Sequence, residues 1–279
     1  MSYEYSEDAL IEQATEDVLK ELGWKVVTAW QNESFGEHGL LGRDNKTEVV
    51  LERFVLAALQ KLNPGLPDLA YSRAIEKLVQ READKTIAQQ NKSKYQLLKN
   101  GVEISFINNE GKSQKKTLKL FDFKEYRNND FLAVRQLEVS GELHNRRPDV
   151  IGFVNGIPLI FFELKSHAND LRSAYDYNFK DYKDTIPHLF YHNAFVILSN
   201  GTDAKIGTIT SPYKYFLDWK RITEEGEGIV SLDTMLRGTC APENLMDIFE
   251  NFLLYDESNG NIVKLMAKNH QFIGVNKVL

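Results

Sequence analysis

Two acidic side chains and a lysine interrupt an otherwise apolar stretch near the middle of the chain. The stretch RRPDVIGFVNGIPLIFFELK carries Asp149 near its start and Glu163 and Lys165 at its end. Neighbouring carboxylates repel each other unless a cation lies between them, and hard oxygen ligands select Mg²⁺ or Mn²⁺. Such an ion polarises a phosphodiester oxygen, while a lysine beside it can position the attacking water. These residue types indicate metal-dependent phosphodiester chemistry, although a strand end with an ordinary ion pair would show them too.

The apolar residues between these charges must supply the geometry. Residues 149–154 and 158–164 are two runs of strand type, and Asn155-Gly156 between them is a strong hairpin signal. A hairpin that turns there would bring the first acid back beside the second, because both lie a similar number of residues from the turn. Strand side chains alternate between faces, so the second acid and the lysine would point the same way. We therefore predict that the three charged groups converge at one end of a buried hairpin.

The pattern Pro148-Asp149 … Glu163-Leu164-Lys165 resembles the PD…(D/E)xK nuclease motif. The longer text, NDFLAVRQLEV followed by RRPDVIGFVNGIPLIFFELKS, is similar to the amino-terminal nuclease domain of type I restriction enzyme R subunits. This similarity covers residues from about 7 to about 217 and includes the segments LNPGLPDLAYSRAI and FVILSNG. The resemblance implies a restriction-endonuclease-like α/β fold, a mixed sheet flanked by helices, and an enzyme that cleaves double-stranded DNA.

The resemblance also implies which residues act on the metal and the phosphate. Asp149, Glu163 and Lys165 would be catalytic, and the metal ligands would be Asp149, Glu163 and the carbonyl of Leu164. The cofactor would be Mg²⁺, with Mn²⁺ as a substitute. Glu12, on the first helix, is a further acid of the kind that related nucleases place near the metal, unless it lies on a solvated helix face.

Contacts to DNA are expected from residues on either side of the hairpin. The R-subunit family carries a glutamine four residues before a tyrosine, in a motif proposed to help hold DNA; this chain has Asn178 and Tyr182 at those positions. Asparagine keeps the amide but is one methylene shorter. Tyr182 could equally be a core residue of a helix packed on the sheet. Arg146 and Arg147 are candidates for contact with the DNA backbone.

The last dozen residues resemble the segment that opens the helicase motor of R subunits. In that family a glutamine corresponding to Gln271 would touch adenine. This chain contains neither a Walker A sequence nor an acidic motor motif, so ATP would serve only a longer protein, of which we expect this chain to be a fragment. The resemblance further implies separate modification and specificity subunits, which would choose the DNA sequence. Cleavage would follow ATP-driven translocation of the DNA by a motor that this chain does not contain.

Composition is consistent with this interpretation. The chain has 279 residues, 42% of them hydrophobic and 27% charged, as in an ordinary globular protein. Its net charge of −6 argues against coating nucleic acid by bulk electrostatics, but basic residues flank the carboxylates locally. The single cysteine, Cys240, excludes an internal disulfide framework. With no signal peptide and no apolar run long enough for a membrane, we expect a cytoplasmic protein.

Periodicity and turn signals predict the remaining elements. We expect a nuclease domain over residues 1–222 with a helical insertion at about 47–95, and a linker with the beginning of a helicase-like motor over residues 223–279. The predicted helices are 6–22, 47–62, 68–90, 168–184, 231–236 and 242–254. The predicted strands outside the hairpin are 24–30, 101–107, 116–123, 131–140, 194–199, 204–210, 213–219 and 262–265, with a turn at 108–112 and a linker at 224–228.

Two other functions remain open on the sequence alone. A stand-alone DNA repair or recombination nuclease of the same fold would cut DNA without ATP or partners. A non-catalytic docking module would bind no metal and would tolerate loss of Glu163. The motor-like segment around Gln271 favours the restriction subunit over the first alternative, and the predicted convergence of three charges favours either nuclease over the docking module.

Overall fold

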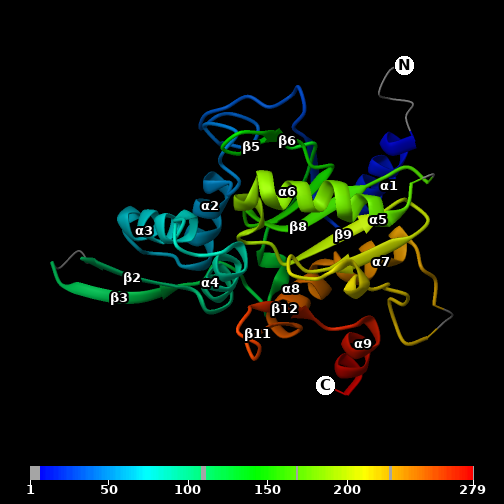
Figure 1. The fold of residues 1–279 in the computed structure, drawn as a ribbon. Coiled ribbons are helices and arrows are strands. Elements are labelled where there is room, and N and C mark those ends of the chain that lie inside the picture. The colour runs from blue at the N-terminus through cyan, green and yellow to red at the C-terminus, as the bar shows by residue number, and fades with distance from the viewer. Residues whose placement is uncertain (1–6, 108–110, 168, 226–227, 279) are drawn as a thin grey trace.

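A six-stranded mixed sheet forms the centre of the computed structural model, which describes residues 7–107, 111–167, 169–225 and 228–278. The strand order is β1-β4-β7-β8-β9-β10; β1/β4 and β8/β9 pair parallel and the other neighbours antiparallel (Figure 1). The strands are β1 (Lys25–Thr28), β4 (Phe131–Arg135), β7 (Val150–Val154), β8 (Ile157–Leu164), β9 (Phe195–Ser199) and β10 (Ala204–Gly207). The predicted mixed α/β architecture is therefore confirmed.

The predicted central hairpin is present as β7 and β8, and every residue of both strands is buried. Asn155 and Gly156 form the turn with positive φ values of 50° and 81°. Both central residues of a type I′ turn need such values, which is why Asn-Gly is favoured there. The Asn155 side chain also donates to the carbonyl of Leu120 at 2.8 Å and so anchors the turn.

The register of this hairpin contains one irregularity that decides the geometry of its open end. The pairing shifts by one residue in the middle of the strands, so that Leu159 of β8 has no partner in β7. Equal counting from the turn would place Phe162 opposite Asp149. The β-bulge instead advances β8 by one residue and brings Glu163 to that position. The sequence-based expectation that the two acids meet is correct, but it depends on a bulge that counting did not include.

Helices cover both faces of the sheet. On one face α1 (Glu7–Glu21), α7 (Leu232–Thr239) and α8 (Pro242–Asn251) share a core with alternate strand residues such as Val150 and Phe162. On the other face a helix runs through α5 (Leu171–Ser173), η3 (Ala174–Phe179) and α6 (Lys180–Thr185) (Figure 1). The intervening strand residues, including Ile151 and Phe161, pack beneath it. By strand alternation Asp149 and Glu163 belong to this second face.

The helical insertion contains three helices rather than two. They are α2 (Glu52–Leu62), α3 (Asp68–Val79) and α4 (Ile87–Asn100), so the predicted single helix over residues 68–90 is wrong. A capping box starts the third helix: the Thr86 hydroxyl accepts from the Gln89 N–H, and the Gln89 side chain accepts from the Thr86 N–H. This reciprocal cap satisfies two backbone N–H groups that have no partner at the start of a helix. It therefore favours the start of a new helix after Thr86.

Several predicted strands lie outside the central sheet. Strands β2 (Val102–Ile107) and β3 (Ser113–Leu118) form a separate ribbon that projects from the molecule (Figure 1), and part of its predicted turn, residues 108–110, lies outside the described residues. The predicted strand 131–140 is divided into β4 and β5 (Val139–Ser140), which pairs with β6 (Asn145–Arg146). The predicted strand 213–219 is wrong: Pro212 leads into the 3₁₀ turn η5 (Tyr213–Tyr215), and only Leu217 bridges to β10.

The C-terminal part of the chain shares the main core. Met235, Leu245 and Phe249 belong to the same buried cluster as β7 and β8, and the Trp24 indole N–H donates to the Cys240 carbonyl at 2.8 Å. The division at residue 222 stays a prediction, and residues 226–227 of the predicted linker lie outside the described residues.

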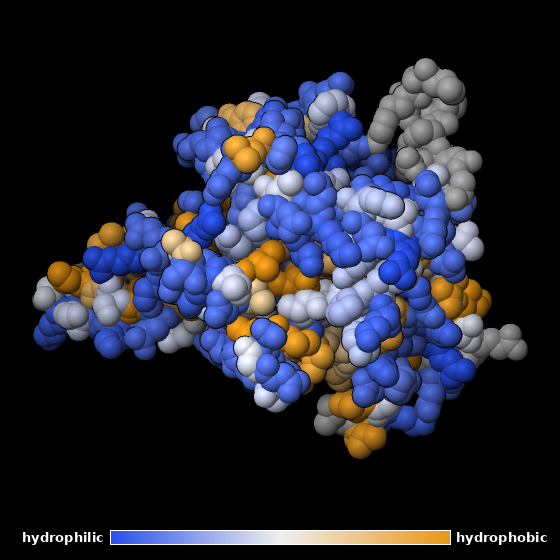
Figure 2. All heavy atoms as spheres, in the orientation of Figure 1, coloured by the Kyte–Doolittle hydropathy of each residue, from blue (hydrophilic) through white to orange (hydrophobic). Residues whose placement is uncertain are grey.

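Beyond α8, the predicted helix 242–254 ends early and gives way to a ribbon of β11 (Leu253–Asp256) and β12 (Val263–Met266), followed by α9 (Asn269–Val278). Figure 2 shows a mostly hydrophilic face over α5 and α6, with apolar side chains gathered lower down. Leu254 and Leu265 of this ribbon are among the exposed apolar residues. Within the described part of the chain, no helix has the length and apolar character needed to span a bilayer.

Candidate active site

The carboxylates lie in a row of residues that crosses the sheet at the end of the hairpin. The Ala29 N–H donates to the carbonyl of Arg135, and the Gln136 N–H donates to the carbonyl of Asp149, both at 2.9 Å. With the register of the hairpin, these bonds align Ala29, Gln136, Asp149 and Glu163 on neighbouring strands. Gln136 adopts a positive φ of 51°, a backbone conformation that residues other than glycine rarely adopt and that often occurs at functional sites.

Asp149 is held by β8 and repelled by its neighbours. Its Oδ2 atom accepts the Leu164 N–H at 2.7 Å, which fixes the carboxylate against the second strand. Burial is the main cause that raises the pKa of Asp149 well above its usual value, and the charge of Glu163 raises it further. The Leu164 N–H and the Lys165 ammonium act in the opposite direction, but they do not offset the burial and the repulsion. The site therefore favours an additional positive charge beside this carboxylate.

Glu163 and Lys165 form an ion pair on the same face of the strand. The Lys165 Nζ lies 2.8 Å from the Glu163 Oε1. The glutamate side chain is 1% exposed and the lysine side chain 23% exposed, so the lysine is the member of the pair that reaches solvent. The structure thus brings together all three residues that the sequence singled out, as two carboxylates and one ammonium at one strand end.

Glu12 approaches the same place from α1 on the opposite face. It is 2% exposed; its carboxylate accepts from the Gln136 side chain at 3.0 and 3.1 Å and from Arg135 at 3.2 Å. Its negative charge contributes to raising the pKa of Asp149. Glu12 is therefore not on a solvated helix face, and its role toward a metal stays a prediction.

The helix above the carboxylates contains a π-helical segment, η3, flanked by α5 and α6. Such segments are rare and often occur at functional sites. Tyr182, in the turn that follows, is 9% exposed and its ring packs edge-on against Phe161 at 5.5 Å. Burial first, then the charges of Glu163 and Asp149, raise the pKa of Tyr182, while a hydrogen bond from Asn178 lowers it. Tyr182 therefore lies under the surface, close to the carboxylates, and remains protonated.

The two adjacent arginines lie in different surroundings. Arg146 forms a two-point ion pair with Asp181 of α6, at 2.5 and 2.9 Å. The guanidinium carbon of Arg147 lies 3.8 Å from the centre of the Trp30 ring, just after β1. Trp30 was not singled out by sequence reasoning, because no local pattern connects a tryptophan after the first strand with an arginine more than a hundred residues later.

Two further candidates lie away from this site. Gln271 is in the first turn of α9, where its side-chain oxygen accepts the Lys268 N–H at 2.8 Å, and Figure 1 shows α9 at the edge of the molecule away from α6. Burial raises the pKa of the Cys240 thiol to about 12, so this cysteine is not poised as a nucleophile. No cluster of three or more His, Cys, Asp or Glu side chains suited to a metal occurs among the described residues.

The sequence matches a family model over residues 4–215, and that model describes the type I restriction enzyme R protein N terminus. The chain belongs to this family. Within the R protein family, it is 33% identical over 279 residues to the type I restriction enzyme HindI endonuclease subunit of Haemophilus influenzae, an alignment covering 96% of this chain and 26% of that protein.

Two further relatives align with nearly the whole of this chain at lower identity. A candidate type I restriction enzyme endonuclease subunit of Methanocaldococcus jannaschii, MjaIXP, is 28% identical over 304 residues, covering 98% of this chain and 27% of that protein. The type I restriction enzyme EcoprrI endonuclease subunit of Escherichia coli is 22% identical over 276 residues, covering 92% of this chain and 84% of that sequence. The chain thus spans about a quarter of the length of the first two relatives.

Proposed function

We propose that this chain is the endonuclease domain of a type I restriction R subunit and hydrolyses phosphodiester bonds of double-stranded DNA with Mg²⁺ as cofactor. The observation that carries the proposal is the position of Asp149 opposite Glu163, with Lys165 paired to the same glutamate, at the end of a buried hairpin. Membership of the R protein family, whose named relatives are restriction endonuclease subunits, supports the nuclease assignment.

The donor set fits a hard divalent cation. Asp149, Glu163 and the Leu164 carbonyl are all oxygen ligands, the type that Mg²⁺ and Mn²⁺ prefer. Burial first, and then the charge of Glu163, raise the pKa of Asp149, and a cation beside this carboxylate would act in the opposite direction. A divalent cation bound there would supply the positive charge that stabilises the phosphate in the transition state.

The protein's own residues would position the reactants. Lys165 is the more exposed member of the pair, and its ammonium would orient the attacking water and donate to a phosphate oxygen. Asp149 is fixed by the Leu164 N–H, so its free oxygen has a defined direction. Tyr182 and Asn178 would shape the protein wall beside the carboxylates, and Arg147 would contact the DNA backbone.

The remaining functions belong to a longer protein. We propose that ATP-driven translocation is carried out by a motor that this chain does not contain, with Gln271 near its edge. Modification and specificity subunits would choose the DNA sequence, and the complex would act in the cytoplasm. These proposals rest on the family and on the share of the relatives' length that the chain covers.

Titration calorimetry with Mg²⁺ and with Mn²⁺ tests the metal site. We expect binding to the wild-type chain and loss of binding when Asp149→Asn is combined with Glu163→Gln. In the assembled restriction complex, Asp149→Ala, Glu163→Ala or Lys165→Ala should each abolish DNA cleavage while the chain stays folded. Unchanged cleavage by any one of these variants, or no metal binding even with duplex DNA present, would refute the proposed function.

The same assays separate the two alternatives. A stand-alone repair or recombination nuclease would cut duplex DNA as the isolated chain, without ATP and without partner subunits. A docking module would bind no metal and would keep its function after Glu163→Gln. The burial of Glu163 at 1% exposure argues against an ordinary surface ion pair. A surface pair keeps both charges hydrated, whereas burial of this carboxylate costs desolvation free energy.

A further inference from the structure

Trp30 and Arg147 form a stacked pair at the end of the sheet that carries the carboxylates. Trp30 follows directly after Ala29, which lies in the same row across the sheet as Asp149. Arg147 precedes Asp149 by two residues, and its guanidinium carbon lies 3.8 Å from the centre of the indole ring. Trp30 is 40% exposed, so the pair lies at the protein surface.

Arg147 has its hydrogen-bonding edge available, in contrast to Arg146. The two-point pair with Asp181 occupies the fork of Arg146. Among the ion pairs of the described residues, none involves Arg147. A guanidinium that lies flat on an aromatic ring keeps its N–H groups directed outward in the ring plane, where they match two oxygens of a phosphate. The neighbouring arginines therefore differ in function although they are identical in type.

Hydrogen bonds of the turn that follows β1 fix the segment that carries Trp30. The Ala29 carbonyl accepts the N–H groups of Asn32 and Glu33 at 2.9 Å, and the intervening Gln31 has a positive φ of 61°. Such strain in a residue other than glycine persists only where the surroundings impose it. Trp30 is thus at the start of a tight, defined turn.

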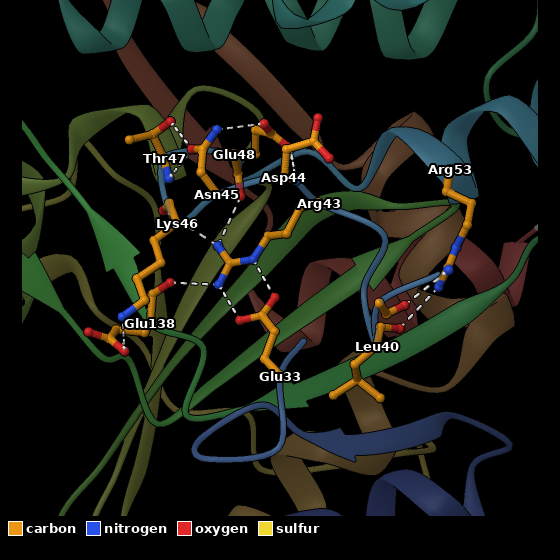
Figure 3. A network of polar contacts seen from close by, with 11 residues as sticks. Glu33, Leu40, Arg43, Asp44, Asn45, Lys46, Thr47, Glu48, Arg53 and Glu138 are labelled. Atoms are coloured by element: carbon orange, nitrogen blue, oxygen red, sulfur yellow. Dashed lines mark hydrogen bonds and ion pairs between the residues drawn. The ribbon is translucent and has the colours of Figure 1, made fainter. Parts of the chain in front are cut away.

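A buried arginine holds the far end of this turn (Figure 3). Arg43, whose side chain is fully buried, binds both oxygens of Glu33 at 2.5 and 2.6 Å. The Arg43 Nη2 group, which binds one of these oxygens, also donates to the Glu138 carbonyl at 2.7 Å, in the segment between β4 and β5. The turn after Trp30 is therefore attached to the segment that leads toward Arg147, and the relative position of the two stacked residues is set by the fold.

The distance from the carboxylates suits a neighbouring phosphate. The strands β1 and β7 are separated by β4 alone, so Ala29 and Asp149 are about 10 Å apart, two inter-strand spacings. A DNA backbone whose reacting phosphate lies at Asp149 and Glu163 would place a phosphate one or two nucleotides away near Trp30. The planar, charged guanidinium of Arg147 is suited to bind a phosphate at that distance.

We propose that Arg147 is a clamp for a DNA backbone phosphate beside the one that is cut, and that Trp30 is a positioning residue that holds the Arg147 guanidinium flat and directed outward. This inference rests on the proposed endonuclease function and adds a phosphate subsite to it. In the same proposal Arg146 is structural, because its guanidinium is paired with Asp181.

The chain contains its own probe for this test. Of its three tryptophans, Trp24 is 3% exposed and Trp219 2% exposed, whereas Trp30 is 40% exposed, so acrylamide quenching reports mainly on Trp30. All variants carry Glu163→Gln so that the DNA stays intact. Addition of a short duplex should reduce quenching in this background; the reduction should be lost in Arg147→Ala and should need a higher DNA concentration in Arg147→Lys.

Salt dependence separates the clamp from a general loss of charge. Each phosphate contact contributes about 0.9 to the slope of log affinity against log salt concentration, so Arg147→Ala should lower that slope by about one. Arg147→Lys should keep the slope but bind more weakly, because it lacks the planar fork. The matched control Arg146→Ala should leave the slope unchanged, since Arg146 is engaged with Asp181.

Trp30 is tested through Arg147. We expect Trp30→Ala to weaken DNA binding about as much as Arg147→Ala, Trp30→Phe to restore it, and the Trp30→Ala, Arg147→Ala double variant to be no worse than Arg147→Ala. An unchanged slope in Arg147→Ala, a lowered slope in Arg146→Ala, additive losses in the double variant, or no DNA binding by the parent would overturn the clamp. The calorimetric metal titration is independent of these residues, so the endonuclease proposal can survive the failure of the clamp.

Discussion

Asp149 and Glu163 face each other across β7 and β8 although Glu163 is one residue farther from the turn. The unpaired Leu159 absorbs the difference, and the Leu164 N–H then binds the Asp149 carboxylate at 2.7 Å. Two acids are thereby placed side by side, Glu163 buried and Asp149 partly exposed, and the charge of Glu163 adds to the desolvation that raises the pKa of Asp149. Such an arrangement costs stability in the absence of a cation, which makes it testable without any assay of activity.

Asp149→Asn should stabilise the metal-free chain at neutral pH. The folded-state pKa of Asp149 is raised, so between its ordinary value near 3.8 and the raised value the folded protein binds more protons than the unfolded chain. Stability then falls as the pH rises through this window. Asparagine keeps an acceptor for the Leu164 N–H but carries no charge, and every tenfold change in proton affinity that it removes corresponds to about 1.4 kcal/mol.

Urea unfolding in the presence of EDTA, at several pH values between 4 and 8, measures this effect. The wild type should lose stability relative to Asp149→Asn as the pH rises, and saturating Mg²⁺ should reverse the order, because only the wild type gains binding energy from the metal. Parallel pH profiles for the two proteins would show that Asp149 is not repelled in the folded state.

Lys165→Met, in contrast to Asp149→Asn, should lower the stability of the metal-free chain. The Lys165 ammonium lies 2.8 Å from the Glu163 Oε1, and the glutamate is 1% exposed. Removal of one partner leaves a buried carboxylate with less compensation, which costs about 1–3 kcal/mol for such a hydrogen-bonded group. Combination with Glu163→Gln should recover most of the loss in metal-free urea unfolding; a double variant as unstable as Lys165→Met would show that the lysine acts by packing instead.

The hairpin could be predicted because its signals are local. Asn155-Gly156 satisfies the positive φ values that a type I′ turn requires, and the apolar runs on either side have the length of buried strands. The convergence of Asp149 and Glu163 follows from that turn only to within one residue. Pro158, next to Leu159, and Gly152, at the shift in β7, are residue types that often mark a bulge in a strand, but counting from the turn did not use them.

The break in the predicted helix at Thr86 had a local signal, the Thr-x-x-Gln capping box, which the helical periodicity obscured.

Contacts between distant residues could not be predicted. The stack of Arg147 on Trp30 and the ion pair of the buried Arg43 with Glu33 have no local signal, because their partners come together only when β1, β4 and β7 are side by side. Tertiary contacts of this kind are set by the sheet order, which local patterns do not encode.

Tyr182 should stabilise the fold through its ring rather than its hydroxyl. The ring is buried against Phe161 at 5.5 Å, so Tyr182→Ala should cost about 3–5 kcal/mol, as for other large buried aromatic side chains. Tyr182→Phe keeps the ring and loses the hydrogen bond with Asn178, worth about 0.5–1.5 kcal/mol. Asn178→Ala is the control, and a loss in Tyr182→Phe as large as that in Tyr182→Ala would contradict this division.

Lys264→Met should be tolerated at pH 7 and should reduce the rise of stability with pH. Lys264, on β12, is 1% exposed; its Nζ donates to the Asn193 carbonyl at 2.5 Å and to the Asn91 side chain at 3.1 Å, between the rings of Tyr95 and Tyr255. Burial lowers the pKa of Lys264 well below 10.5. Below 10.5 and above that lowered value, the unfolded chain binds a proton that the folded chain does not, so stability rises with pH in this window.

Methionine fills the space left by that lysine, and both acceptors keep another donor: the Tyr255 hydroxyl binds the Asn91 side-chain oxygen at 2.5 Å, and the Asn91 amide binds the Asn193 carbonyl at 2.9 Å. The free energy of unfolding at pH 7 should therefore change by less than about 1.5 kcal/mol, as for other swaps that conserve volume. Lys264→Ala, which leaves a cavity, should cost about 2–5 kcal/mol. A large loss in Lys264→Met with an unchanged pH slope would mean instead that the lysine is charged in the folded protein and that its two hydrogen bonds hold β12 to α4 and to the segment before β9.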